Sequence, residues 1–391
     1  MRVEFEYWWL LALPLFFMLG WLAARIDIKH ILSQSKQLPE SYFKGLNFLL
    51  NQQPDKAIEA FTEAAKADTE TVELHFTLGG LFRRRGEMDR AIHLHQALVD
   101  RPDLGTEQRL VAQFELGQDF LAAGFLDRAE AIFKALAETH YADQALRFLM
   151  EIYVQEREWQ QAISTAERLA TQTNQPHQIE ISHFLCELAT LESVAGRYEA
   201  ARQYLDQALS INRRSVRASL LLGEFEATQG RHEEALAIWN RIESQQPEFL
   251  SLVVGKMLTS FKALGRTGEG LTQLKHYLEK YSSIDMLNMV YQASLENEGI
   301  AKAYPLVREE LQRHPTLQGY EKLLEAQLFE VTAEQRPHVE LVKNLIHQHS
   351  QRLAYYQCTG CGFKARQFFW HCPACTGWET FPPRRIEEIS A

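Results

Sequence analysis

Residues 223–242 read GEFEATQGRHEEALAIWNRI, and this stretch contains the pattern that decides the fold. Gly223 stands twelve positions before Ala235, and Gly230 stands five positions before it. Trp239 follows Ala235 by four positions, so the two side chains share one face of a helix. The pattern predicts two helices joined by a glycine turn, which approach closely where the small residues meet.

The same pattern recurs about every 34 residues between Pro39 and Ser282. The pairs of residues twelve apart are Gly45 and Ala57, Gly79 and Ala91, Gly117 and Ala129, Met150 and Ala162, Ala189 and Ala201, Gly223 and Ala235, and Leu258 and Gly270. The second members are 34, 38, 33, 39, 34 and 35 residues apart, and the two long steps place longer loops at 103–107 and 173–177. One helix pair cannot bury its apolar stripe alone, so neighbouring pairs are expected to stack into an all-α solenoid.

This pattern resembles the tetratricopeptide repeat, with six clear copies and a degenerate seventh. The resemblance implies a concave surface that binds a peptide or protein and has no chemistry of its own. The repeat residues are therefore predicted to be core positions. Gly299 and Ala303 hint at an eighth unit, and residues 284–350 are expected to form degenerate helical repeats that cap the array.

Four of the five cysteines lie near the C-terminus, as Cys358-Thr-Gly-Cys361 and Cys372-Pro-Ala-Cys375. Two C-x2-C turns offer four sulfurs to one tetrahedral metal ion, either iron or zinc. Residues 351–391 can bury little core, so metal binding is expected to supply folding free energy. The motif resembles a rubredoxin-like or zinc-ribbon knuckle, with a spacer too short for the electron-transfer rubredoxins. Two disulfides in an exported protein are the alternative.

Other residues near the cysteines have predicted roles. His371 is expected either to hydrogen-bond a ligand or to be an exposed neighbour of Cys372. The aromatic residues are expected to pack around the metal or against the last helices, with any surplus forming a docking patch: Phe363, Phe368, Phe369, Trp370 and Trp378. Arg384 and Arg385 are expected to face solvent.

Three further features are predicted to be structural. His347 and His349 are read as a solvated helix end, with service as alternative ligands kept open. The rings of His93 and His95 are expected on different faces of a helix, which disfavours a metal site. Cys186 is predicted to be a buried thiol.

Tyr7 to Ala24 read YWWLLALPLFFMLGWLAA, eighteen residues without a charge. A helix of this length is about 27 Å long, close to the thickness of the hydrocarbon core of a membrane. Residues 1–25 are therefore interpreted as a retained transmembrane anchor, with a cleaved signal peptide as the alternative. More positive charges follow the segment than precede it, so the N-terminus is expected outside and the bulk of the chain in the cytoplasm.

The composition narrows the class of function. The chain has 391 residues and a formal net charge of −10, which argues against a nucleic-acid-binding protein. It contains no phosphate-binding loop, nucleophile elbow or zinc-protease motif, so no enzyme is predicted. The expected division is an anchor at 1–25, repeats at 26–283, a helical cap at 284–350 and a metal-binding module at 351–391.

The three parts in this order resemble the lipopolysaccharide assembly protein B family of Gram-negative bacteria, over essentially the whole chain. The most specific motif is Tyr356-x-Cys358-x-x-Cys361-Gly362-Phe363, followed by Phe369-Trp370-His371-Cys372-Pro373-x-Cys375. The resemblance implies that Cys358, Cys361, Cys372 and Cys375 are metal ligands.

The same resemblance implies a role. It implies an inner-membrane regulator of lipopolysaccharide synthesis that promotes degradation of the deacetylase LpxC by the membrane protease FtsH. Other lipopolysaccharide synthesis or transport proteins are implied partners, and a homo-oligomer is compatible with the sequence. From the residues alone, a redox or metal-sensing protein and a general binding scaffold remain alternatives.

Overall fold

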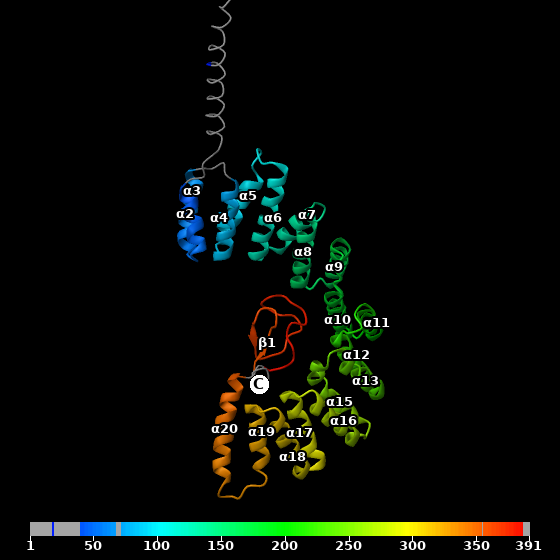
Figure 1. Ribbon diagram of the computed structural model, residues 1–391. Coiled ribbons are helices and arrows are strands. Elements are labelled where there is room, and N and C mark those ends of the chain that lie inside the picture. Colours follow the sequence, from blue (N-terminus) through cyan, green and yellow to red (C-terminus); the bar gives the residue numbers. More distant parts are fainter. Residues whose placement is uncertain (1–17, 19–39, 68–71, 354, 386–391) are drawn as a thin grey trace, which may run out of the picture. The chain divides into compact units, whose positions relative to one another are not determined.

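The computed structural model describes residue 18 and residues 40–67, 72–353 and 355–385 (Figure 1). The chain divides into two compact units, residues 1–145 and 146–391. None of the helices in these described ranges is long and apolar enough to cross a membrane. Apart from Met18, the predicted anchor at residues 1–25 lies outside them.

The first unit consists of antiparallel helix pairs. Its helices are α2 (Glu40–Leu50), α3 (Pro54–Ala67), α4 (Val72–Arg85), α5 (Met88–Val99), α6 (Thr106–Ala122) and α7 (Leu126–Leu136). Helix α8 (Ala142–Glu156) begins in this unit and continues into the second. The core of α2 to α5 is apolar and includes Phe61, Leu74 and Leu81, each at most 3% exposed.

The second unit continues the pairs and ends in a small module. Its helices are α9 (Trp159–Thr173), α10 (Gln178–Val194), α11 (Tyr198–Ile211), α12 (Val216–Thr228), α13 (His232–Trp239), α14 (Ile242–Gln245), the 3-10 helix η2 (Pro247–Leu252), α15 (Val254–Ala263), α16 (Thr267–Lys280), α17 (Ile284–Glu298), α18 (Ile300–Arg313), α19 (Leu317–Gln327) and α20 (Arg336–Leu353). Strands β1 (Tyr356–Gln357) and β2 (Lys364–Ala365) form an antiparallel hairpin, with Tyr356 opposite Ala365.

The predicted close approach of paired helices is confirmed. A Cβ added at Gly223 would lie 2.2 Å from Trp239, and one at Gly117 would lie 2.9 Å from the ring of Phe133. In each case the large residue stands four positions after the alanine of the twelve-residue spacing and fills the space left by the glycine. The repeat is therefore a small-to-large contact between the two helices of each pair.

His95 occupies the same position in the second repeat and is fully buried. A Cβ at Gly79 would lie 2.3 Å from its Nε2. Its Nδ1 lies 2.5 Å from Oδ2 of buried Asp119, whose other oxygen accepts a hydrogen bond from Arg83 at 2.7 Å. A polar ring in this core position thus needs a buried partner. His93 is exposed, as expected from the helix geometry.

The turns between paired helices share one backbone conformation. The glycines at the predicted turn position have φ between 70° and 83°: Gly86, Gly124, Gly196, Gly230 and Gly265. In the two repeats without a glycine, Gln52 and Arg157 take the same conformation, with φ of 55° and 60°. Repeat packing therefore imposes a left-handed turn even where the residue type disfavours it.

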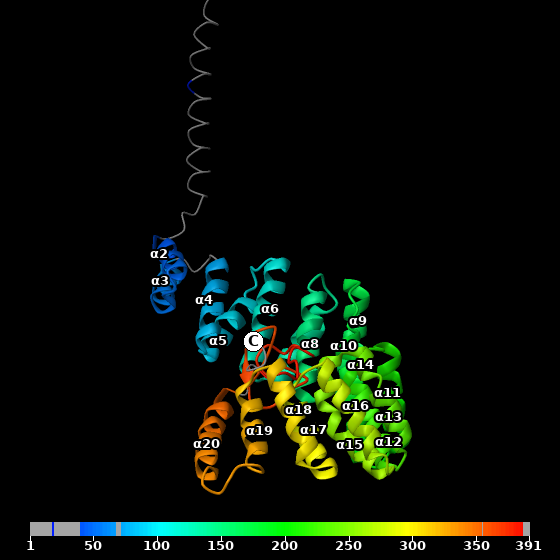
Figure 2. The ribbon, with the colours of Figure 1, turned by 60° about the horizontal axis from the view of Figure 1, so that its bottom comes forward.

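The cap predicted after residue 283 is helical. Helices α17 and α18 form an eighth pair in which Ala303 is fully buried, and α19 and α20 follow. The two long repeat spacings correspond to loops between α5 and α6 and between α9 and α10. In the second unit, helices α9 to α20 curve around the C-terminal module that contains the β1–β2 hairpin. The module lies on the inner side of this curve (Figures 1 and 2).

Candidate metal centre

Two turns of the same geometry carry the four cysteines. In the first, the Cys358 carbonyl accepts from Gly362 N–H, and Cys358 N–H donates to Phe363, both at 2.9 Å. In the second, Cys372 makes the matching bonds with Thr376 and Gly377 at the same distances. Gly362 and Thr376 both have positive φ, 76° and 56°, so Thr376 takes a conformation that glycine adopts in the first turn.

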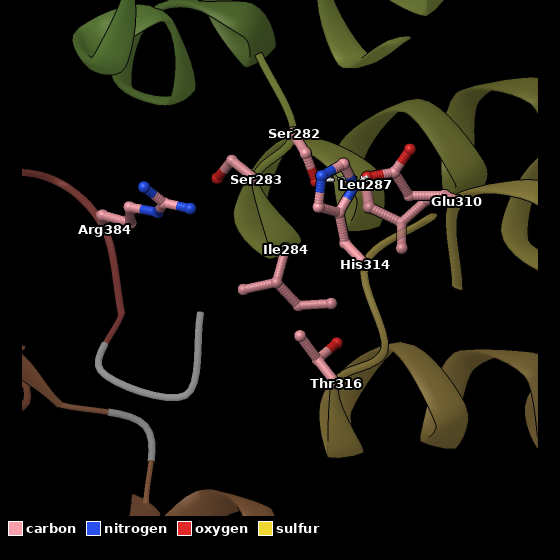
Figure 3. Close-up of a pocket in the computed structure, with 8 residues that line it drawn as sticks. All are labelled: Ser282, Ser283, Ile284, Leu287, Glu310, His314, Thr316 and Arg384. Atoms are coloured by element: carbon pink, nitrogen blue, oxygen red, sulfur yellow. Dashed lines mark hydrogen bonds and ion pairs between the residues drawn. The ribbon is translucent and has the colours of Figure 1, made fainter. Parts of the chain in front are cut away.

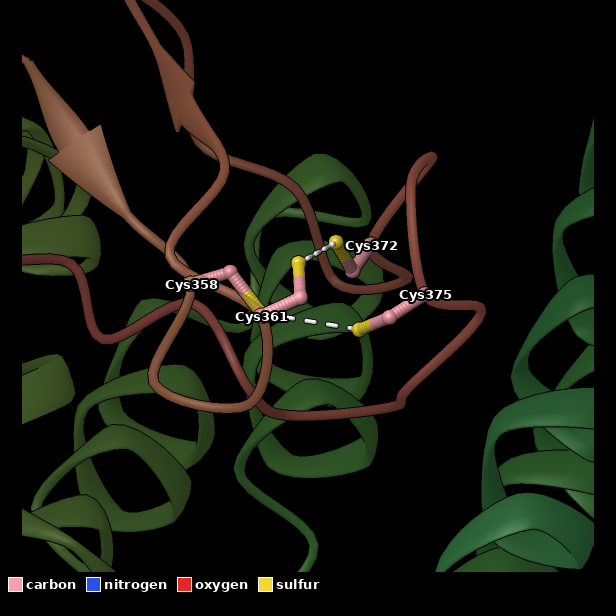
Figure 4. A group of neighbouring side chains, drawn as sticks. All are labelled: Cys358, Cys361, Cys372 and Cys375. Carbon is pink, nitrogen blue, oxygen red and sulfur yellow. Dashed lines mark hydrogen bonds between the residues drawn. The ribbon is translucent and has the colours of Figure 1, made fainter. Parts of the chain in front are cut away.

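These turns bring the four sulfur atoms together (Figure 4). Each Sγ of Cys358, Cys361, Cys372 and Cys375 lies within 4.8 Å of the others. Cys358 and Cys375 are 3.6 Å apart, and Cys361 and Cys372 are 3.8 Å apart. A regular tetrahedron with metal–sulfur bonds of about 2.3 Å has edges of about 3.8 Å, so the cluster fits one such ion. All four thiols are free, so this structure contains no disulfide there.

The two sides of the cluster differ in exposure. Cys358 and Cys372 are buried, whereas Cys361 and Cys375 are exposed. Burial raises the pKa of Cys358, but hydrogen bonds from Thr380 and from nearby backbone N–H groups lower it to about 6. The Phe363 backbone lowers the pKa of Cys361, while burial and the neighbouring sulfurs raise it to about 12. The N–H and O–H donors around Cys358 thus favour its thiolate form, the form that binds a cation.

His371 takes neither of its two expected roles. Its ring is partly buried and stacks on Trp378, with centroids 4.5 Å apart. Burial lowers its pKa, while a hydrogen bond with the Thr376 backbone raises it. The histidine therefore supports the loop that follows Cys375.

Aromatic side chains fix the module against the solenoid of the second unit. Trp370 stacks on Phe249 of η2 at 5.4 Å, with ring planes 7° apart. Trp378 stacks on His183 of α10 at 4.6 Å and meets Phe184 edge-on. Phe368 and Phe369 pack around the buried cysteines, as one of the expected arrangements, and Trp370 and Trp378 form the expected docking contact. The docking contact lies on η2 and α10, because the chain turns back after α20.

Polar contacts accompany this stacking. Glu379 has a φ of 55°, and its carboxylate lies 3.0 Å from Nε2 of fully buried His183. Its other oxygen accepts a bond from Gln246 at 3.4 Å. Burial lowers the pKa of His183, although Glu379 raises it. Glu379 thus has a left-handed backbone conformation at the point where its side chain contacts the solenoid.

Asp285 anchors the end of the module to α17. It accepts a hydrogen bond from the Tyr356 hydroxyl at 2.9 Å and from Arg385 Nε at 3.0 Å. Arg385 also lies over the Tyr356 ring, 5.0 Å from its centroid. The expectation that Arg385 faces solvent was therefore wrong, since its charge is matched by Asp285. Arg384 is exposed, as expected.

The remaining candidates lie away from the cysteine cluster. His347 hydrogen-bonds Glu321 of α19 at 2.8 Å. Among the described residues, the group able to hold a metal is formed by the four C-terminal cysteines, without His347 or His349. Cys186 is fully buried, and burial raises its thiol pKa to about 12, as expected for a structural thiol.

Sequence reasoning missed the solenoid half of the contact, formed by His183, Phe249 and Asp285. They are isolated residues on three separate helices, and Glu379 lies 196 positions after His183. No short-range pattern marks such residues. The one available signal was a surplus of aromatic residues around the cysteines, which indicated a docking surface without locating its partner.

Comparison with protein families agrees with the division into helical repeats and a four-cysteine module. The tetratricopeptide repeat model matches residues 44–103, 114–177 and 186–248. The rubredoxin metal binding domain model matches residues 356–383. The chain is also similar to solved repeat structures. The match to the structure of Naa15/Naa10 bound to HypK-THB covers 79% of this chain, with 13% sequence identity and a TM-score of 0.41. Against a tetratricopeptide repeat protein of Parabacteroides merdae the TM-score is 0.28, with 15% identity over 74% of this chain.

Curated relatives extend over almost the full length. Lipopolysaccharide assembly protein B of Escherichia coli K12 is 35% identical over 378 residues, covering 96% of this chain and 97% of the relative. The protein of the same name from Haemophilus influenzae is 30% identical, covering 97% of this chain and 98% of the relative. With its tetratricopeptide solenoid and its four-cysteine rubredoxin-like module, this chain belongs to the lipopolysaccharide assembly protein B family.

Proposed function

We propose that this chain is an inner-membrane regulator of lipopolysaccharide biosynthesis that works as a non-catalytic adaptor and scaffold. In this role it promotes FtsH-dependent proteolysis of the lipid A deacetylase LpxC and gathers lipopolysaccharide assembly enzymes. The observation that carries the proposal is the full-length similarity to relatives named for lipopolysaccharide assembly. Tetratricopeptide repeats, which commonly bind proteins, support the scaffold part.

The metal site has its own place in this proposal. Cys358, Cys361, Cys372 and Cys375 hold one tetrahedral ion, iron or zinc, and the distances between their sulfurs support this assignment. The ion would neutralise thiolate charge and cross-link the two turns. The residues around it then hold the module on the solenoid, because Trp370, Trp378 and Glu379 flank the cysteines in the sequence.

The membrane part of the proposal rests on the sequence. Residues 1–25 form a single-pass anchor with a periplasmic N-terminus, followed by cytoplasmic repeats at 26–283, a helical cap at 284–350 and the metal module at 351–391. The uncharged run from Tyr7 to Ala24 and the positive charges after it support this topology. A tether beside a membrane protease raises the effective concentration of the two proteins.

The half-life of LpxC after depletion of this protein tests the proteolytic role. Synthesis would be stopped in depleted cells and in cells carrying the gene on a plasmid, and LpxC would be followed by immunoblot. A markedly longer half-life on depletion is expected, with restoration by the plasmid. An unchanged half-life would refute the adaptor role and leave a scaffold that acts without proteolysis.

A redox or metal-sensing role is the second candidate. It is favoured by the exposure of Cys361 and Cys375, which leaves one edge of the sulfur cluster open to solvent. An iron-loaded site with a reversible reduction potential and a charge-transfer colour would support it. Colourless zinc-loaded protein that restores LpxC turnover fully would exclude it.

A further inference from the structure

The start of helix α17 opens into a cavity that contains an unpartnered hydroxyl. Ser283, the residue before α17, is only 8% exposed, and its Oγ has no hydrogen-bond partner. Two adjoining cavities meet at this residue: an inner recess of about 30 Å³ and an outer one of about 320 Å³. A buried hydroxyl without a partner is uncommon in proteins, and a water, an ion or a ligand atom can satisfy it.

A positive side chain lies across the cavity from this hydroxyl. Arg384 lines both cavities, and Figure 3 shows the Ser283 hydroxyl turned toward its guanidinium group. The backbone on each side of Arg384 is held. The carbonyl oxygen of Pro383 accepts a hydrogen bond from Ser251 at 3.3 Å, and Arg385 pairs with Asp285. Docking of the metal module therefore places Arg384 at the mouth of the cavity.

The helix end supplies a third group of donors. In the 15-residue α17 the backbone N–H groups of Asp285 and Met286 have no acceptor within the helix and carry part of its positive partial charge. Ser283 does not cap them, because its side chain makes no cap hydrogen bond. Asp285 in the first turn faces the module instead, where it accepts bonds from Tyr356 and Arg385. Helix ends of this kind bind anions when the donors converge.

The charged residues that line the cavity limit the kind of anion that it can bind. Glu310 is already engaged by the Ser282 hydroxyl and by His314, 3.2 Å away, and Lys280 pairs with Glu243. Glu248 also lines the outer cavity. Formal charges therefore nearly cancel, and selectivity must come from directed O–H and N–H donors. A group with several oxygens in a tetrahedron suits donors that arrive from a helix end, a hydroxyl and a guanidinium.

We propose that this cavity binds a phosphate group, either as the free ion or as the end of a phosphomonoester. Ser283 and the α17 N-terminus bind its inner oxygens, and Arg384 covers it from the side of the metal module. The outer cavity of about 320 Å³ leaves room for the alcohol part of an ester. The site joins α17 to the segment after the second cysteine pair, so a bound phosphate would reinforce docking of the module.

Calorimetric titration of sodium phosphate into the purified, metal-loaded, full-length protein tests the site. The experiment is run at neutral pH and physiological salt in a phosphate-free buffer, and one saturable site is expected. Ser283→Ala and Arg384→Gln should each weaken phosphate binding about tenfold. This is the change in affinity expected from the loss of one hydrogen bond to a charged group. Ser283→Thr keeps the hydroxyl and should retain most of the affinity.

Matched controls are available in the same unit. Ser210 on α11 is exposed and bonds only the Gln207 carbonyl, and Arg336 on α20 pairs with Glu340. Ser210→Ala and Arg336→Gln should leave phosphate binding unchanged. Far-UV circular dichroism confirms folding of each variant. Absence of saturable binding to the unaltered protein would overturn the proposal, as would equal weakening by the control variants.

Glycerol phosphate, titrated in the same way, identifies the source of the phosphate. Tighter binding of the ester than of the free ion assigns the site to phosphomonoesters. Tighter binding of the free ion assigns it to inorganic phosphate. Both results support the site, whereas failure of both ligands to bind refutes it. LpxC turnover is not used as a readout, so the outcome is independent of the proteolytic role.

Discussion

Two adjacent glycines in α4 are under different packing constraints because of their positions in the repeat. Gly79 and Gly80 are neighbours in α4, yet only one of them faces the paired helix. A Cβ at Gly79 would lie 2.3 Å from His95, whereas one at Gly80 would meet nothing within 4 Å. The first glycine is required by packing, and the second only weakens its helix.

The two alanine substitutions should therefore have opposite effects on stability. Gly79→Ala should lower the free energy of unfolding by about 2 kcal/mol, because His95 and its bond to Asp119 must shift. Gly80→Ala should raise it by about 0.5–1 kcal/mol, the difference in helix propensity. Urea unfolding followed by circular dichroism measures both. Equal effects would contradict the packing role assigned to Gly79.

His183 predicts a pH dependence of stability. Burial lowers its pKa below the ordinary value of 6.5, so the folded protein keeps the ring neutral where the unfolded chain takes up a proton. Stability from this group is present above pH 6.5 and is lost as pH falls below it. The loss should reach at most about 1.4 kcal/mol per pH unit.

Urea unfolding at two pH values, one on each side of the ordinary histidine pKa, checks this. His183→Gln keeps an N–H donor toward Glu379 but cannot titrate, so its stability should fall less on acidification. Acid effects on the cysteine site are shared by both proteins and cancel in the comparison. A larger loss in the variant than in the unaltered protein would show that His183 is charged in the fold.

At the scale of elements, the metal module has two separable properties: folding of its turns and docking on α10, η2 and α17. The turns depend on the four cysteines, whose sulfurs lie within 4.8 Å of one another. Docking depends on aromatic contacts such as Trp370 on Phe249. Variants can therefore remove one property while keeping the other.

Cys372→Ser should lower metal content, unfold the turns and release the module, because a buried ligand is lost. Trp370→Ala should keep the metal and weaken docking by about 2–3 kcal/mol. Metal analysis and hydrogen exchange of α10 report the two properties, while circular dichroism should show an intact solenoid in both variants. Cys186→Ala is the control for metal content alone, since this fifth cysteine lies outside the cluster but is buried in α10. Normal metal content in Cys372→Ser would refute the four-ligand assignment.

At the scale of the whole molecule, the proposed role depends on attachment to the membrane. Removal of residues 1–25 should leave a folded, metal-binding protein, because the described repeats and the cysteine cluster have cores of their own. The truncated protein should fail to restore LpxC turnover in depleted cells, since the tether supplies effective concentration. Fusion of an unrelated membrane helix should restore it. Full activity of the untethered protein would show that co-localisation is not the mechanism.

The sequence by itself determined the repeat architecture and the cysteine cluster. Both depend on short-range patterns: a glycine sixteen residues before Trp239 belongs to the same helix pair, and each C-x2-C turn closes on itself. The repeat spacing also located the two longer loops near 103–107 and 173–177, although Thr106 and Glu107 begin α6 and Thr173 ends α9.

Only the tertiary structure decided where the module docks and what its neighbours do. Arg385 was expected in solvent and pairs with Asp285, while His371 stacks on Trp378. Contacts such as that of Glu379 with His183 join residues 196 positions apart and depend on the accumulated curvature of many helix pairs. That curvature is the sum of small rotations between successive helix pairs, and no local sequence pattern encodes it. The sequence therefore predicted the repeats and the cysteine module, whereas three-dimensional packing decided the contacts between them.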